Sequence, residues 1–431
     1  MEALDIVILI ISFVIFLLLG VPVAYSLGLS AVLTLLIGAH PMAAFTALAQ
    51  RMATGLDSFT LLAIPFFILA GQLMNKGGIA IRLIDFAKVL VGRLPGGLAF
   101  VNIVANMLFG SISGSAGASA SAIGGFMTPV MEKEGYARPF SAAVNITSAT
   151  TGLVIPPSNI LIVYSLASGG VSIAALFIAG YLPGLLVGLA LMIVAAYHSR
   201  HFKTPATEKV SVKYALIKFL DALPSIFLLV IVIGGIIAGI FTATEASVIA
   251  VVYTLILAFI YKELKPSDLP EVLLGTVKTV AIVMLLIATS IALSWVLSFE
   301  NVPQDISSAL LNLSDNKFIL LLIINSILLI VGIFMDMTPA VLIFTPIFLP
   351  VMLQFGVNPI HFGIVMIVNL CVGLCTPPVG AVLFIGCSVA DVTIEQVIKP
   401  LLPFFVAMIT ALLLITYIPE ISLWLPRLFG L

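Results

Sequence analysis

Residues 110–117, with the sequence GSISGSAG, combine small side chains with three hydroxyl groups inside a long apolar stretch. Such a segment forms a poor lipid-facing helix, but it can present carbonyl and hydroxyl oxygens to a cation that has lost its water. The alternative is a close crossing of two helices through small residues. We interpret the tip of this segment as a site and leave the neighbouring Ser119 and Ser121 to helix packing.

A second apolar stretch carries a single carboxylate, Asp336, within the sequence Phe334 to Pro339. An isolated carboxylate at membrane depth costs several kcal/mol unless it is paired or binds a cation. Asp336 is therefore the strongest single candidate for a cation ligand in the sequence.

Two Pro-Pro pairs, 156–157 and 377–378, each follow a run of small and hydroxyl residues. Two consecutive prolines remove two backbone donors, so upstream carbonyl groups lose their helical partners and can bind Na⁺. The helix that starts after each pair has free amide groups and a positive dipole end, which suit an anion. Each motif thus predicts a broken helix with a cation site and a carboxylate site. A simple kink repaired by neighbouring helices is the alternative, and two related copies make it the weaker one.

The elements that position these groups must lie in a membrane. Of the 431 residues, 62% are apolar and 9% are charged, against ~25% charged residues in a typical soluble domain. The formal net charge is −1, so there is no basic field for nucleic acid. Several runs reach the ~20 apolar residues of a membrane span, and the sequence predicts an all-α, multi-pass membrane protein.

The two interrupted regions align when the chain is shifted against itself: Gly152 falls on Gly373 and the first Pro-Pro pair falls on the second. The chain is predicted to be a two-fold repeat. The predicted division is a first repeat at 1–197, with a hairpin at about 95–132 and a broken helix at about 137–167; a cytoplasmic linker at 198–218; and a second repeat at 219–431, with a hairpin at about 318–355 and a broken helix at about 360–390.

Charge placement predicts that the repeats are inverted. Lys88, Arg93, Lys133 and Arg138 flank the first interrupted region, whereas the second has only Lys317. By the positive-inside rule the first re-entrant hairpin opens to the cytoplasm and the second to the outside. Inverted repeats with interrupted helices are the architecture of secondary transporters, with the site at the midplane.

The sequence offers no support for an enzyme. It contains no Walker A motif, no Gly-x-Ser-x-Gly elbow with a plausible histidine partner and no His-Glu-x-x-His. An ion gradient is therefore the expected energy source. Glu245, in Thr242-Ala243-Thr244-Glu245, is expected to end a helix-capping sequence rather than belong to a site.

Taken together, these motifs resemble the large membrane subunit of tripartite ATP-independent periplasmic (TRAP) transporters, with the sialic acid type favoured. The resemblance covers nearly the whole chain. The residues that carry it are Leu62 to Phe67, Gly110 to Ala116, Thr128-Pro129 with Gly135-Tyr136, Ile155 to Asn159, Thr244 to Ala246, and Thr376 to Gly380.

The resemblance implies a fold like the elevator transporters of the ion transporter superfamily, with Na⁺-coupled uptake of an organic acid. Sialic acid is favoured from overall similarity, and a C4-dicarboxylate or a sugar acid is possible. Na⁺ is implied at Ser113, Ser115, Gly152, Pro156, Asp336, Thr338, Gly373 and Thr376, and substrate at Ser111, Ser158, Asn159, Thr376 and Gly380.

The implied partners are a periplasmic substrate-binding protein that delivers the acid and a small four-helix membrane subunit, expected as a separate chain. The implied location is the bacterial inner membrane. The competing hypothesis is a stand-alone exchanger or channel of the wider inverted-repeat class, which would need neither partner. A membrane enzyme is the weakest alternative.

Overall fold

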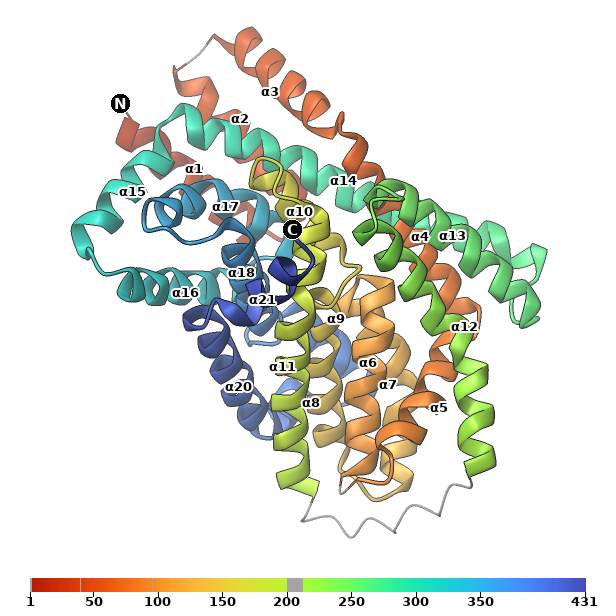
Figure 1. The fold of residues 1–431 in the computed structure, drawn as a ribbon. Helices are drawn as coiled ribbons and strands as arrows, with labels where there is room; N and C mark the ends of the chain where they lie inside the picture. The colour runs from red at the N-terminus through yellow and green to blue at the C-terminus, as the bar shows by residue number, and fades with distance from the viewer. Residues whose placement is uncertain (1, 39, 95, 200–211) are drawn as a thin grey trace.

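The computed structural model describes residues 2–38, 40–94, 96–199 and 212–431, and this part of the chain forms helices and connecting loops without a strand (Figure 1). It contains eight helices long and apolar enough to cross a membrane, or nine if the pair Arg138–Val154 and Asn159–Ala167, bent by 51°, is one span. Large apolar side chains face outward, such as Ile193 at 71% and Val406 at 65% exposure. Because water would not favour such a surface, the protein is a multi-pass membrane protein.

The first half of the chain supplies helices up to residue 199. They are α1 (Glu2–Leu18), α2 (Val23–Gly38), α3 (Pro41–Leu56), the 3₁₀ helix η1 (Phe59–Leu62), α4 (Ala63–Lys76), α5 (Ile79–Val91), α6 (Gly97–Ser113), α7 (Ala116–Lys133), α8 (Arg138–Ala149), α9 (Thr151–Val154), α10 (Asn159–Ala167) and α11 (Ile173–Ser199).

The second half repeats this order in the register that places Gly152 on Gly373. Its helices are α12 (Val212–Ile237), α13 (Ala243–Ile260), the 3₁₀ helix η2 (Pro266–Asp268), α14 (Leu269–Phe299), α15 (Val302–Leu313), α16 (Lys317–Phe334), α17 (Met337–Gln354), α18 (Pro359–Leu374), α19 (Ala381–Ala390), α20 (Ile394–Tyr417) and α21 (Glu420–Leu428).

Each half contains the expected hairpin and broken helix. The hairpins are α6–α7, which turns at Gly114-Ser115, and α16–α17, which turns at Met335-Asp336. The broken helices are α8–α9–α10 and α18–α19, interrupted at the two Pro-Pro pairs, and both Pro-Pro bonds are cis. In Figure 1 the first hairpin rises from the bottom of the view, near the lower ends of α11 and α12, while α16 and α17 lie on the left.

Helices of each repeat pack on the hairpin of the other repeat. The helix after the first break, α10, packs on α17 of the second hairpin, and the corresponding helix of the second repeat, α19, packs on α7 of the first. The same reciprocity holds farther out, where α13 packs on α4 and α2 packs on α14. Each hairpin is therefore covered in part by the opposite repeat.

A close glycine crossing joins each hairpin to its own broken helix. A Cβ atom on Gly152 would overlap the backbone of Gly110, and a Cβ atom on Gly373 would overlap the backbone of Gly332. Only glycine allows the two backbones of each crossing to approach so closely. The small residues at the first tip thus serve helix packing, as the alternative interpretation held, in addition to any site.

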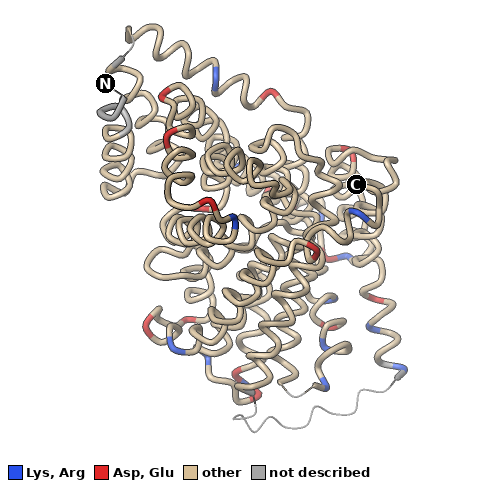
Figure 2. The backbone as a smooth tube through the Cα atoms, turned by 60° about the vertical axis from the view of Figure 1, so that its left-hand side comes forward, with Lys and Arg blue, Asp and Glu red and all other residues tan. Residues whose placement is uncertain are grey.

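Charged residues are sparse and lie mostly near helix ends and loops (Figure 2). Two ion pairs fasten α5 to α12: Lys218 Nζ lies 2.6 Å from Asp85 Oδ2, and Arg82 Nε lies 3.3 Å from Asp221 Oδ1. Most of the predicted linker at 198–218, including Arg200, Lys203 and Lys209, lies outside the described residues, so its boundaries stay a prediction.

Thr242 and Glu245 form the expected cap at the start of α13. The Thr242 hydroxyl accepts a hydrogen bond from the Glu245 backbone N–H at 3.2 Å, and the Glu245 carboxylate accepts one from the Thr242 N–H at 2.8 Å. Glu245 therefore has a structural use at a helix end, as expected.

Candidate functional site

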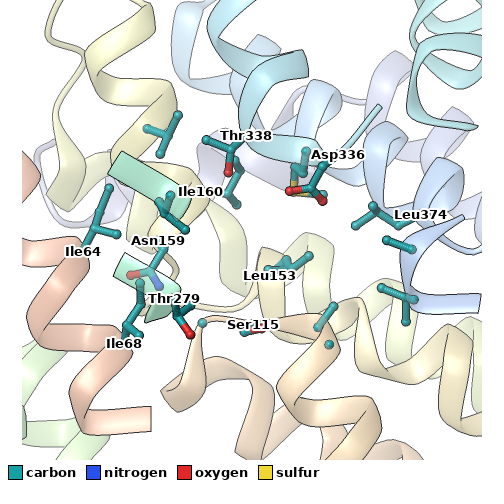
Figure 3. Close-up of a pocket in the computed structure, with 18 of the residues that line it drawn as sticks. Ile64, Ile68, Ser115, Leu153, Asn159, Ile160, Thr279, Asp336, Thr338 and Leu374 are labelled. Atoms are coloured by element: carbon teal, nitrogen blue, oxygen red, sulfur yellow. The ribbon is translucent and has the colours of Figure 1, made fainter. Parts of the chain in front are cut away.

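A cavity of about 270 Å³ lies where the two hairpin tips and the two broken helices meet (Figure 3). Its polar side chains come from both repeats: Ser115 and Asn159 from the first, and Thr279, Asp336 and Thr338 from the second. Segments far apart in the sequence therefore share one site. The remaining wall is largely apolar and includes Ile64 and Ile68 of α4 and Val283 of α14.

Four helices begin at this cavity. The first two residues of α7, α10, α17 and α19 all line it. These residues are Ala116 and Gly117, Asn159 and Ile160, Met337 and Thr338, and Ala381 and Val382. The first turns of a helix have unsatisfied N–H groups and a positive dipole end, so four such ends favour an anion in the cavity. No Lys or Arg is found among the described residues that line it.

Asp336 is the one acidic side chain among the described residues of this wall. It is the N-cap residue of α17 at the tip of the second hairpin, and its carboxylate makes no capping hydrogen bond. Its side chain is accessible and lines the cavity. The charge of Asp336 can therefore meet a cation bound there.

Asn159 faces Asp336 from a different side of the cavity (Figure 3). Its side chain packs on Gly114 of the first hairpin tip, where an added Cβ would lie 3.0 Å from Asn159 Nδ2. Gly114 has φ +61°, a conformation that favours glycine. Asn159 Oδ1 is buried and has no hydrogen-bond partner among the described residues, so it can accept from a ligand or bind a cation.

Most of the chain is similar to one family of known proteins. Residues 10–421 match the family model described as the tripartite ATP-independent periplasmic transporter, DctM component. The chain belongs to this family. A member of this family from Pseudomonas aeruginosa, described below, is a large permease protein, and the expected large-subunit identity is thereby confirmed.

Two curated relatives match over almost their whole length. An uncharacterised protein of Salmonella typhimurium, YgiK, is 56% identical over 97% of this chain and 96% of its own. The C4-dicarboxylate TRAP transporter large permease protein of Pseudomonas aeruginosa is 41% identical over 94% of this chain and 95% of its own.

A solved structure confirms the fold class at low sequence identity. The YdaH transporter of Alcanivorax borkumensis, described as having an unusual topology, has a TM-score of 0.62 at 13% identity, over 90% of this chain and 88% of that one. The expected all-helical fold with repeats, hairpins and broken helices is therefore confirmed for this family member.

Four of the residues implied by the family resemblance line the cavity: Ser115, Asn159, Asp336 and Thr338. Ser113 lies next to it, on a smaller cavity that also contacts Ser115. The remaining implied residues belong to the same sequence motifs but do not line the cavity: Ser111, Gly152, Pro156, Ser158, Gly373, Thr376 and Gly380.

Several of these hydroxyl groups already have intramolecular acceptors. Ser158 Oγ donates to the Leu153 carbonyl at 2.6 Å, Thr376 Oγ1 to the Val372 carbonyl at 2.7 Å, and Ser111 Oγ to the Leu108 carbonyl at 2.8 Å. The Leu153 carbonyl lies just before the first break, where the two prolines have no N–H to donate to upstream carbonyl groups. The Ser158 hydroxyl supplies the missing donor, so this carbonyl is not left free for Na⁺. Gly380 is the N-cap residue of α19, and an added Cβ would lie 2.7 Å from the Thr376 carbonyl oxygen.

Sequence reasoning missed Thr279, whose side chain lies beside Asn159 in Figure 3. It belongs to α14, an unbroken apolar helix with no motif, and its hydroxyl donates to the Gly275 carbonyl at 3.1 Å. Nothing in the local sequence distinguishes it from other threonines within apolar helices, because its position depends on how α14 packs on α4 and α17.

A buried amide network near the first hairpin was also missed. Asn106 Nδ2 lies 2.7 Å from Asn102 Oδ1, 3.1 Å from Asn145 Oδ1 and 2.9 Å from Ser148 Oγ, and Ser119 Oγ donates to Asn106 Oδ1 at 2.7 Å. The network joins α6, α7 and α8 into one unit. Asparagine within apolar runs was the available signal, because buried amides need partners.

Proposed function

We propose that this protein takes up an organic acid together with Na⁺ by alternating access of the elevator type. One observation carries the proposal: four helix N-termini and one carboxylate surround a cavity whose described lining contains no basic side chain. The helix ends favour the carboxylate of the acid, and Asp336 favours a cation. A site built in this way binds the two species together better than either alone.

The position of Asp336 supports the proposed sodium coupling. A substrate carboxylate in the same cavity would be repelled by the Asp336 charge in an environment with little water. A bound Na⁺ offsets that repulsion. It would be coordinated by a carboxylate oxygen of Asp336 and by the hydroxyl oxygens of Ser115 and Thr338. Further oxygen ligands for Na⁺ are proposed in the motifs that contain Ser113, Gly152, Pro156, Gly373 and Thr376.

The family to which the chain belongs is one component of a tripartite transporter. We therefore propose that a periplasmic binding protein delivers the acid and that a small four-helix subunit accompanies this chain in the bacterial inner membrane. We propose sialic acid as the substrate, with C4-dicarboxylates, which the Pseudomonas relative is named for, and sugar acids as the competing classes.

The elevator component rests on how the helices divide around the cavity. The hairpins and broken helices pack on one another across the repeats, while α4 and α14 pack on each other, contact α6 and α17, and supply a wall that includes Ile64, Ile68 and Val283. A unit held together by buried amides and glycine crossings can move as one body against this wall. The ion pairs between α5 and α12 would anchor the connection between the two parts.

Reconstituted vesicles test the proposal. The purified complex is expected to accumulate acid only when Na⁺ is outside and a loaded binding protein is present. Flux that persists without Na⁺ and without binding protein would contradict the proposal and favour a stand-alone exchanger or channel. Chemical change of the recovered solute would instead indicate an enzyme.

A further inference from the structure

A second, smaller cavity of about 60 Å³ adjoins the first. The two cavities share Ile68, Ser115 and Thr279 in their walls. We name the smaller one the annex, and its other polar residues are Gln72, Asn75 and Ser113. A water molecule needs ~10–15 Å³ of such space, so the annex has room for a few small polar groups.

One face of α4 runs along both cavities. Ile64 and Ile68 line the main cavity, and Ile68, Gln72 and Asn75 line the annex. These residues are spaced by three or four, so they share a helix face, and at 1.5 Å per residue Ile64 and Asn75 are about 16 Å apart along the axis. A ligand lying along this face meets apolar side chains first and two carboxamides next.

The chemistry of the annex differs from that of the main cavity. The described residues of its wall include no charged side chain, whereas carboxamides and hydroxyls offer both donors and acceptors. A second carboxylate would lose its hydration there without a counter-charge. An alkyl group would leave the amide groups unpaired, which a polar site penalises strongly.

We propose that the annex binds the uncharged, hydroxyl-bearing part of a monocarboxylate whose carboxylate occupies the main cavity. This inference rests on the proposed function and narrows its substrate class to hydroxylated monoacids, to which sialic acid and sugar monoacids belong. Dicarboxylates and plain fatty acids fall outside the class. Gln72 and Thr279 are the residues assigned to selectivity, because they contact the substrate through its hydroxyl groups and not through its charge.

Binding to the purified complex with its small subunit, in NaCl, tests the assignment without depending on which acid a binding protein delivers. Three acids of equal carbon number serve as probes: D-gluconate, hexanoate and adipate. Titration calorimetry is expected to give D-gluconate an affinity about tenfold higher than that of either other acid, as expected when a site is built to bind hydroxyl groups. Gln72→Leu and Thr279→Val are each expected to remove most of this preference and to change hexanoate binding less than about twofold.

Thr410→Val is the matched control, because Thr410 is an exposed threonine of α20 whose hydroxyl donates to the Val406 carbonyl at 2.7 Å, and it lines neither cavity. This variant should bind all three acids like the wild type. Equal losses for D-gluconate and hexanoate in the annex variants, or tightest binding of adipate, would overturn the annex assignment and leave the proposed function standing. Failure of every acid to bind in the presence of Na⁺ would overturn both.

Discussion

The tips of the two hairpins occupy equivalent places and carry different chemistry. The repeat alignment places Ser115 on Asp336, and each is the N-cap residue of the second helix of its hairpin, α7 or α17. Ser115 uses its hydroxyl to accept the Ala118 backbone N–H at 3.3 Å, whereas the Asp336 carboxylate makes no such cap. Both side chains reach the same cavity.

The difference shows that fold symmetry and site symmetry are separate properties. The repeat supplies two helix starts aimed at the cavity, and a single residue decides whether a start favours an anion or a cation. Because Ser115 caps α7 with an uncharged hydroxyl, the N-terminus of this helix keeps its positive dipole end. The second tip adds a negative charge to the same geometry, so the two halves can hold opposite charges side by side.

The strongest test of this comparison is Asp336→Asn, which keeps the shape of the side chain and removes its charge. Loss of a charged interaction worth about 2 kcal/mol corresponds to a roughly 30-fold weaker response to Na⁺. Uptake by vesicles at varied NaCl measures it. Ser115→Ala is the paired variant and is expected to shift the Na⁺ response less. An unchanged Na⁺ response in Asp336→Asn would remove Asp336 from the cation site.

Variants at the glycine crossings test whether close helix packing constrains the two repeats equally. Gly152→Ala and Gly373→Ala each place a Cβ atom against the backbone of the hairpin, and each is expected to cost about 1.5 kcal/mol of stability through overpacking. Thermal unfolding of the purified complex measures the loss. Gly125→Ala is the control, because Gly125 lies in α7 with nothing within 4 Å of an added Cβ. Wild-type stability in both crossing variants would show that the helices can separate without cost.

The broken helices of the two repeats differ at Asn159, because the repeat alignment places this asparagine on Gly380. The first repeat thus presents a carboxamide, whereas backbone carbonyls leave no room for a side chain at Gly380. Asn159→Ala is expected to lower the apparent affinity for substrate about tenfold through one lost polar contact, while co-purification with the small subunit stays unchanged. Normal uptake kinetics would make Asn159 a structural residue only.

The smallest expected effect concerns the cap of α13. Thr242→Ala removes the hydroxyl that accepts the Glu245 N–H and is expected to cost ~1 kcal/mol of stability. The corresponding position of the first repeat is Val21, which cannot cap α2. Thermal unfolding is again the measurement, and the Na⁺ response should stay that of the wild type. A changed Na⁺ response in Thr242→Ala would indicate that the capping pair, including Glu245, also affects the site.

Much of the fold could be predicted because its signals are local. Apolar length predicts spans, and consecutive prolines predict the two breaks whatever surrounds them. The alignment of the two halves then pairs the motifs without any structure. The first hairpin was predicted at about 95–132, and α6 and α7 run from Gly97 to Lys133.

The site was predicted less completely, because it depends on packing. Ser115, Asn159, Asp336 and Thr338 stand in motifs whose irregular backbone marks them, and all four line the cavity. Ser158 stands in the same motif, yet its hydroxyl is used by the Leu153 carbonyl. Thr279 has no motif and still reaches the cavity, because the packing of a straight helix decides which of its faces meets the others.

The exchange of helices between the halves bears on the origin of the protein. Since α10 packs on α17 and α19 packs on α7, neither half covers its own hairpin completely. A single unduplicated copy would therefore leave part of its hairpin exposed. This packing is the one expected of an antiparallel homodimer whose two copies became joined in one chain.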